Sequence, residues 1–102
     1  MDWYKDIKIN KRLYRIKKAE DGKHKYVAWT ASKMGDKYLL SAPVRFGDVS
    51  MEHYKDKFKQ YSRLDHNDKK RLDNFRSRFG SQYEKIKGDP SSALFWSWNY
   101  LW

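Results

Sequence analysis

The sequence predicts a single α+β domain over residues 1–102: an N-terminal antiparallel β-hairpin or meander followed by two or three short helices packed on one face. Three observations lead to this class. The length of 102 residues is that of one domain. Apolar side chains alternate around turn signals over about residues 9–48, and they recur at helical spacing over about residues 50–102. Aromatic residues form 18% of the chain, so a few large side chains can fill a small core.

Residues 12–31, RLYRIKKAEDGKHKYVAWTA, predict a β-hairpin. Asp21-Gly22 is a typical two-residue type I′ turn, which requires positive φ at both positions. With this pair at the tip, Ile16 lies opposite Val27 and Tyr14 opposite Trp29. Side chains alternate along a strand, so these four share the face toward the core. The other face is then basic with one tyrosine, and it carries Leu13, Arg15, Lys17, Tyr26 and Ala28.

The flanking segments give weaker strand signals. A turn over residues 33–36 leads to a third predicted strand over residues 37–41. Pro43 lacks an amide donor and limits further pairing, so residues 44–46 are expected to form only a short edge segment. Residues 1–9 fit either a helical turn, through Trp3 and Ile7, or a strand, through Ile7 and Ile9.

Three helices are predicted after residue 50. Met51, Tyr54, Phe58 and Tyr61 recur at helical spacing behind Ser50, a natural N-cap. A second helix is predicted with Asp65 as its N-cap and Asp68 three positions later, close to a capping box. Its apolar stripe is Leu72, Phe75 and Phe79, and Gly80 is expected to end it. A third helix is predicted over residues 90–101, with Asp89 as N-cap and Pro90 as its first residue.

The last ten residues, ALFWSWNYLW, carry no charge and three of the five tryptophans. A helix that is apolar nearly all round is expected to be wrapped by the rest of the domain, here as a core plug against the hairpin. Such a helix also has more faces than a small sheet can cover. Exposed aromatic side chains are favoured anchors at protein interfaces. The predicted protein-interface residues are Trp96, Tyr100 and Trp102.

Charge is the strongest compositional signal. Lys and Arg number 23 against 13 Asp and Glu, which gives a formal net charge of +10. This balance favours a polyanionic partner, either nucleic acid or an acidic protein surface. In the second predicted helix, basic residues flank the apolar stripe on both sides. Either their stems cover the core edge or they contact phosphates, forming one continuous basic surface with the open sheet face. The predicted nucleic-acid-binding residues are Arg15, Lys17, Tyr26, Lys69, Lys70, Arg71, Arg76 and Arg78.

Catalytic and metal-binding signals are weak. The chain has no Cys, which excludes disulfides and thiolate zinc sites and fits a reducing compartment. His53 and His66 with Asp48 and Asp65 make a metal site conceivable, but helix capping and salt bridges explain these carboxylates better. We therefore predict no metal, no cofactor and no enzymatic activity. No membrane span or signal peptide is evident, so the protein is expected to be soluble, cytoplasmic and not secreted. A match of two residues, Asp65-His66, to the start of the HNH nuclease motif leaves a metal-dependent nuclease as an alternative.

The segments RFGD, MEHYKD, LDHNDKKR and DPSSALFWSWNYLW span residues 45–102. They resemble a family of small proteins of uncharacterised function from tailed phages and giant DNA viruses, and the FWSW…LW ending is the specific part. Two departures stand out: Phe79 occurs where an Arg-His pair is common, and Leu94 replaces a small Gly. The resemblance implies a viral protein and supplies no activity. Family-like positions are Phe46, Gly47, Tyr54, Asp65, His66, Arg71, Pro90, Phe95, Trp96 and Trp102.

The leading hypothesis is a non-enzymatic viral accessory or minor virion (capsid-associated) protein. It would dock on viral structural proteins through aromatic surface and present a basic face to nucleic acid, in the virion or the host cytoplasm. The first alternative is a free DNA- or RNA-binding regulator that does not read sequence. The second is the HNH-like nuclease.

Overall fold

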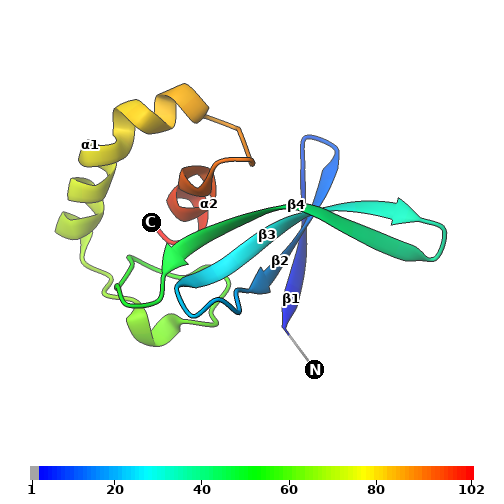
Figure 1. Ribbon diagram of the computed structural model, residues 1–102. Coiled ribbons are helices and arrows are strands. Elements are labelled where there is room, and N and C mark those ends of the chain that lie inside the picture. The colour runs from blue at the N-terminus through cyan, green and yellow to red at the C-terminus, as the bar shows by residue number, and fades with distance from the viewer. Residues whose placement is uncertain (1–2) are drawn as a thin grey trace.

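The computed structural model describes residues 3–102, and it confirms the α+β class with an N-terminal meander followed by helices (Figure 1). Four strands form one antiparallel sheet in the order β1-β2-β3-β4. The elements are β1 (Tyr4–Ile9), β2 (Arg12–Lys18), β3 (His24–Met34), β4 (Lys37–Asp48), the 3-10 turn η1 (Ser62–Leu64), α1 (Lys69–Ile86) and α2 (Ala93–Tyr100).

The ambiguous N-terminal segment contains an edge strand, β1. It pairs with β2 through a two-residue connection, Asn10-Lys11, whose residues both have positive φ (50° and 69°). This is the backbone twist that a tight hairpin needs. The tight two-residue turn that was expected at Asp21-Gly22 therefore occurs instead in the preceding hairpin, between β1 and β2.

The predicted register of the β2–β3 hairpin is wrong by one residue. Ile16 pairs with Ala28, and Tyr14 pairs with Thr30. Of the Asp21-Gly22 pair only Gly22 has positive φ, and the connection spans residues 19–23 instead of two residues. The Asp21 carboxylate accepts hydrogen bonds from the amides of Lys23 and His24 (both 2.9 Å), which stabilises this longer loop.

A slip of one residue exchanges the two faces of a strand. Tyr26 and Ala28 therefore join Tyr14 and Ile16 in the core, whereas Val27 and Trp29 turn to the other face. Tyr26 is fully buried, so its predicted place on the basic face is wrong.

β4 is one long edge strand rather than two short segments. Ser41 pairs with Thr30 and Val44 with Ala28, so a bulge at Ala42-Pro43 lies opposite Trp29. Ala42 adopts φ 49° in this bulge. Pro43 is accommodated because it lies in a bulge of an edge strand, where its missing amide donor removes no hydrogen bond between strands.

The predicted first helix does not form. Residues 49–68 make an irregular connection that contains only η1 and a β-bridge between His53 and Asp65. Phe58 and Tyr61 are buried in the core, but Met51 is 60% exposed. The carboxylates of Asp56 and Asp65 accept hydrogen bonds from backbone amides of this connection. These bonds give the amides an alternative to helical hydrogen bonds.

Both remaining helices begin later than predicted. Asp68, not Asp65, caps α1 and accepts from the amides of Lys70 and Arg71. Ser92, not Asp89, caps α2, since the Asp89 carboxylate accepts from Ser91 in the turn before it.

Gly80 lies inside α1 and does not end it. A helical glycine costs about 1 kcal/mol relative to alanine, which packing of the following turns can offset. Tyr83, one of the residues beyond it, stacks on Trp98 of α2 with ring centres 4.2 Å apart.

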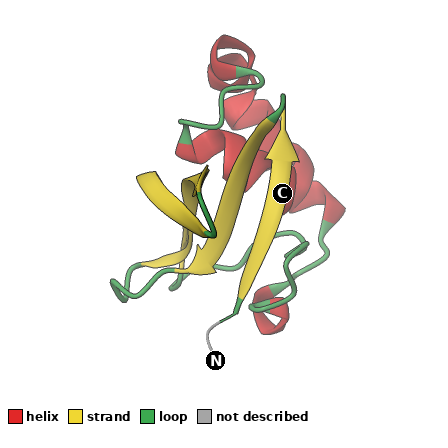
Figure 2. Cartoon of the chain, turned by 90° about the vertical axis from the view of Figure 1, so that its right-hand side faces the viewer, coloured by secondary structure: helices red, strands yellow, loops and turns green. Residues whose placement is uncertain are grey.

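The elements form three layers: the sheet, then α2, then α1, with both helices on the same side of the sheet. α2 packs on the sheet at β4, and α1 packs on α2, so α1 is separated from the strands (Figures 1 and 2). Trp96 of α2 is fully buried and stacks on Phe46, and its indole nitrogen donates to the Pro90 carbonyl (2.8 Å). The prediction that the last helix plugs the core is confirmed. Trp96 as an exposed protein anchor is wrong.

Candidate functional site

The sheet face that no helix covers is the first candidate site (Figure 2). Arg15 pairs with Trp29, Lys17 pairs with Val27, and Val27 pairs with Arg45, so alternation places all of them on this face. We call it the open face and define it by Tyr4, Arg15, Lys17, Trp29, Lys33, Tyr38 and Arg45.

Arg15 lies at the centre of the open face in a fixed position. Its guanidinium donates two hydrogen bonds to Asp6, at 2.8 and 3.0 Å. The same group lies over the rings of Tyr4 (4.3 Å) and Tyr38 (5.5 Å), which come from the two edge strands. The bond to Asp6 raises the pKa of Arg15. Asp6 thus balances the charge of Arg15, and other residues supply most of the free positive charge.

Two hollows on the open face carry that charge. One, of about 360 Å³, is lined by Trp29, Lys17 and Arg45 together with Glu20 and Asp21, and Arg45 lies 3.7 Å from the Asp21 carboxylate. The other, of about 650 Å³, is lined by four cationic residues and Tyr38. These four are Lys8, Lys11, Arg12 and Lys33. Trp29 and Arg45 were not predicted on this face, because the register that places Trp29 there depends on a loop whose length the sequence did not predict.

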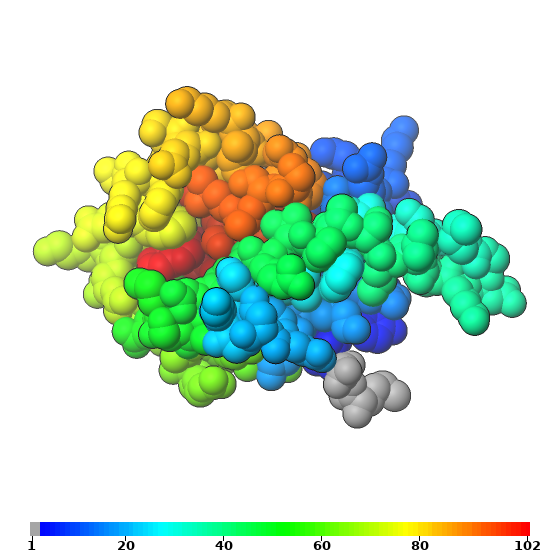
Figure 3. Space-filling model, in the orientation of Figure 1, coloured from blue at the N-terminus to red at the C-terminus, as the bar shows by residue number. Residues whose placement is uncertain are grey.

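The basic residues of α1 do not continue the open face. α1 packs on α2, which lies on the opposite side of the sheet, and Figure 3 shows α1 and the β3–β4 tip at opposite ends of the molecule. The predicted continuous basic surface is therefore wrong. Lys69 and Lys70 are exposed near the start of α1. Arg76 donates to the Trp102 carbonyl (3.0 Å) and lies over Trp98, so its stem covers the core edge.

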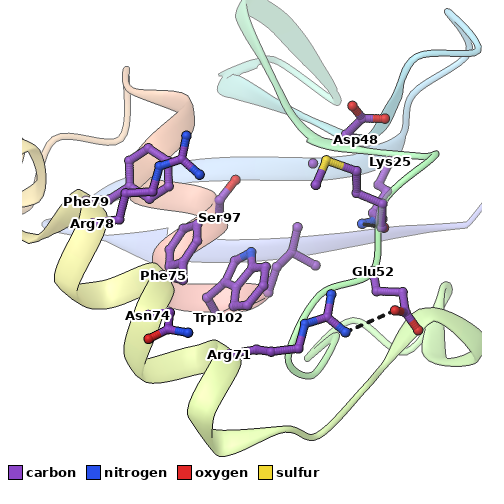
Figure 4. Close-up of a pocket in the computed structure, with 13 residues that line it drawn as sticks. Lys25, Asp48, Glu52, Arg71, Asn74, Phe75, Arg78, Phe79, Ser97 and Trp102 are labelled. Atoms are coloured by element: carbon purple, nitrogen blue, oxygen red, sulfur yellow. Dashed lines mark hydrogen bonds and ion pairs between the residues drawn. The ribbon is translucent and has the colours of Figure 1, made fainter.

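A groove between α1, the end of α2 and the end of β4 is the second candidate site (Figure 4). Its volume is about 630 Å³, and it brings Arg71 and Arg78 together with Trp102. Phe75 and Trp102 stack in parallel on its floor, with ring centres 4.3 Å apart. Residues predicted separately for nucleic-acid contact and for protein contact thus meet in one place.

The groove carries charge on both sides. On the α1 side, Arg71 donates to Glu52 at 3.0 Å. On the other side, the buried Lys25 ammonium donates to the Met51 carbonyl (2.7 Å), and burial lowers the pKa of Lys25. The third predicted interface residue, Tyr100, lies away from the groove lining, half-buried against Phe58.

His53 and His66 lie in two segments of the connection that hydrogen-bond to each other, and the His66 amide donates to the His53 carbonyl (2.9 Å). His53 is fully buried, and its Nε2 lies 2.5 Å from an Asp65 carboxylate oxygen. His66 Nδ1 accepts from the amide of Asp68 at 2.9 Å. Across residues 3–102, no three His, Asp or Glu side chains converge as metal ligands.

Comparison of the chain with protein-family models, curated proteins and solved structures finds no match. Neither α1 nor α2, the helices of the described residues, has the length and apolarity to cross a membrane.

Proposed function

We propose that the chain is a non-enzymatic accessory protein that binds the backbone of nucleic acid through the open face without reading base sequence. The observation that carries this proposal is the placing of Lys17 and Arg45 around Trp29, next to the hollow lined by Lys8, Lys11, Arg12 and Lys33. Two carboxylates beside these cations are already paired, Asp6 with Arg15 and Asp21 with Arg45 (3.7 Å).

Flexible basic side chains spread over a sheet favour contacts with phosphates rather than with base edges. Phosphate contacts position a protein on nucleic acid and carry no direct sequence information. They release condensed counterions, so binding weakens steeply with salt, by about 0.9 in log–log slope for each duplex phosphate neutralised. Four phosphates held by the open face would give a slope of about −3.6.

The experiment is a salt titration of binding to a labelled DNA duplex and an RNA of equal length. The double variant Lys17→Glu, Arg45→Glu is expected to bind both probes at least roughly tenfold more weakly and to reduce the slope by about 2. The matched control is Lys85→Glu, Lys87→Glu, which makes the same change of net charge at exposed positions near the end of α1. Equal losses in the two double variants, or no binding at low salt, would contradict the proposal.

The predicted α1 contacts are tested on the same probes. Lys69→Glu with Lys70→Glu changes net charge by the same amount on a separate surface. A loss there comparable to that of Lys17→Glu, Arg45→Glu would move the binding site from the open face to α1.

We further propose a place for this accessory protein in the virion, which rests on the resemblance to phage and giant-virus proteins that the sequence of residues 45–102 suggests. Mass spectrometry of purified particles separates that role from a free regulator. A stoichiometric copy number supports the virion role, and absence from particles supports the regulator.

A further inference from the structure

The groove beside α1 combines an aromatic floor with an unequal distribution of charge. Phe75, Phe79 and Trp102 contribute aromatic surface, and Arg71 and Arg78 come from the α1 wall (Figure 4). These two arginines are seven residues apart, so they lie on one side of the helix, about 10 Å apart along its axis. Arg71 is paired with Glu52, whereas Arg78 forms no ion pair with any residue in the described range 3–102.

Two neighbouring residues of the chain itself occupy one end of the groove. Met51 and Glu52 lie along one end of it: Met51, an exposed apolar side chain, lines the groove, and the Glu52 carboxylate binds Arg71. An apolar residue followed by an acidic one therefore meets the α1 wall at this end. Two helical turns further on, Arg78 lies over the ring of Phe79 with its guanidinium 5.2 Å from the ring centre. Arg78 and Phe79 offer the same pairing of a cation with an apolar surface.

We propose that this groove binds a short acidic segment of a partner protein, with an apolar side chain on the Phe75–Trp102 floor and a carboxylate on Arg78. Clusters of arginine are a recurrent means of recognising acidic peptides, and carboxylates bind guanidinium groups in a forked geometry. A volume of about 630 Å³ is within the usual range for a site that holds a few side chains.

Nucleic acid fits the groove less well than such a peptide. Asp48 and Glu52 line the side opposite Arg78, so a uniformly charged backbone running through the groove would meet like charge. A peptide can place its carboxylates toward α1 and its apolar side chains toward the floor. The proposal concerns a surface separate from the open face, and it does not require the nucleic-acid function.

The test uses fluorescence polarisation of a labelled peptide, Gly-Asp-Glu-Phe-Leu-Glu-Asp-Gly, with the full chain. Saturable binding tighter than about 1 mM is expected. The same peptide with Ser in place of Phe and Leu is expected to bind at least roughly tenfold more weakly, because it cannot bury apolar surface on the aromatic floor. Arg78→Glu is expected to cause a comparable loss, and Lys85→Glu, an equal charge change on the same helix, is expected to leave affinity within about twofold.

Three outcomes would overturn the proposal. The first is no binding of the Phe-Leu peptide at that concentration, or equal binding of both peptides. The second is an equal effect of Arg78→Glu and Lys85→Glu, which would mean that only net charge matters. The third is another occupant: Arg78→Glu weakens binding of the DNA duplex instead, or it dissociates a dimer of the chain seen by sedimentation.

Discussion

At the scale of single residues, Asp56 organises the connection between the sheet and the helices. Its buried carboxylate accepts hydrogen bonds from the Tyr26 hydroxyl (2.5 Å) and from the amides of Phe58 (2.8 Å) and Tyr61 (2.9 Å). Burial and the neighbouring carboxylate raise the pKa of Tyr26, so its hydroxyl remains a donor. One acidic side chain thus links β3 to a segment that has no regular structure of its own.

Asp56→Ala is expected to destabilise the fold by at least about 3 kcal/mol, because a buried donor without an acceptor costs about 1–3 kcal/mol and three lose theirs. Tyr26→Phe removes one hydrogen bond and leaves Asp56 with its two amides, so it is expected to cost only about 1 kcal/mol. Urea unfolding measures both. Similar losses in the two variants would show that Asp56 does not hold the connection.

The buried His53 and the partly buried His66 of this connection predict a pH dependence. Burial lowers the pKa of both His53 and His66 below the ordinary value of 6.5, with Lys25 adding to the effect at His53 and Arg71 at His66. The unfolded imidazoles take up protons near pH 6.5, whereas the folded ones do so only at lower pH. The unfolded chain therefore binds more protons between these values, which lowers the free energy of unfolding as pH falls.

We expect the free energy of unfolding to decrease from pH 7 to about pH 5, and the double variant His53→Gln, His66→Gln to lose most of that slope. Asp21 and Asp48, whose pKa values lie below 3.8, do not titrate in this interval. Urea unfolding at a series of pH values measures the slope. A flat profile in the native chain would show that neither histidine is kept neutral by burial.

At the scale of elements, Gly47 allows the end of α2 to approach β4. Its φ is +75°, and an added Cβ would lie 2.9 Å from Leu101 Cδ1 and 3.2 Å from Lys25 Cβ. Gly35, in the β3–β4 turn, also has positive φ (+63°) but has no atom within 4 Å of such a Cβ. The two glycines share the backbone requirement and differ only in packing.

Gly47→Ala is therefore expected to cost about 1–3 kcal/mol more than Gly35→Ala, which carries the strain of positive φ alone. Thermal or urea unfolding of the two variants gives the difference. If both lose the same stability, α2 does not pack against β4 as closely as described.

The element types that the sequence predicts well are those with strong local signals. The strands around residues 12–31 and the two helices α1 and α2 were predictable from periodicity, although only α2 contains buried aromatic residues. The register was not, because it depends on how Asp21 binds the amides of its own loop. The helix predicted over residues 51–61 does not form for a similar reason. The carboxylates of Asp56 and Asp65 accept hydrogen bonds from backbone amides of this segment in place of helical carbonyls. Their side-chain partners, Tyr26 and His53, lie 30 and 12 residues away in the sequence, so local periodicity does not reveal these contacts.

At the scale of the whole molecule, positive charge is divided between surfaces that face different directions. The open face lies on one side of the sheet, and the α1 arginines and the groove lie beyond α2 on the other (Figures 1 and 2). The sequence predicted Arg15 and Lys17 on the open face. It predicted Tyr26 and Trp96 on the surface, but both are in the core. Their burial follows from the strand register and from the order of the layers, which the sequence did not predict.

The most direct test of the central claim is amide chemical-shift mapping during titration with a short DNA duplex. We expect the largest shifts along β2, β3 and β4 at Arg15, Lys17, Trp29 and Arg45, together with the indole signal of Trp29. The amides of α1 are expected to change little. Shifts confined to α1 and the groove, with β2 and β3 unchanged, would contradict the assignment of nucleic-acid binding to the open face.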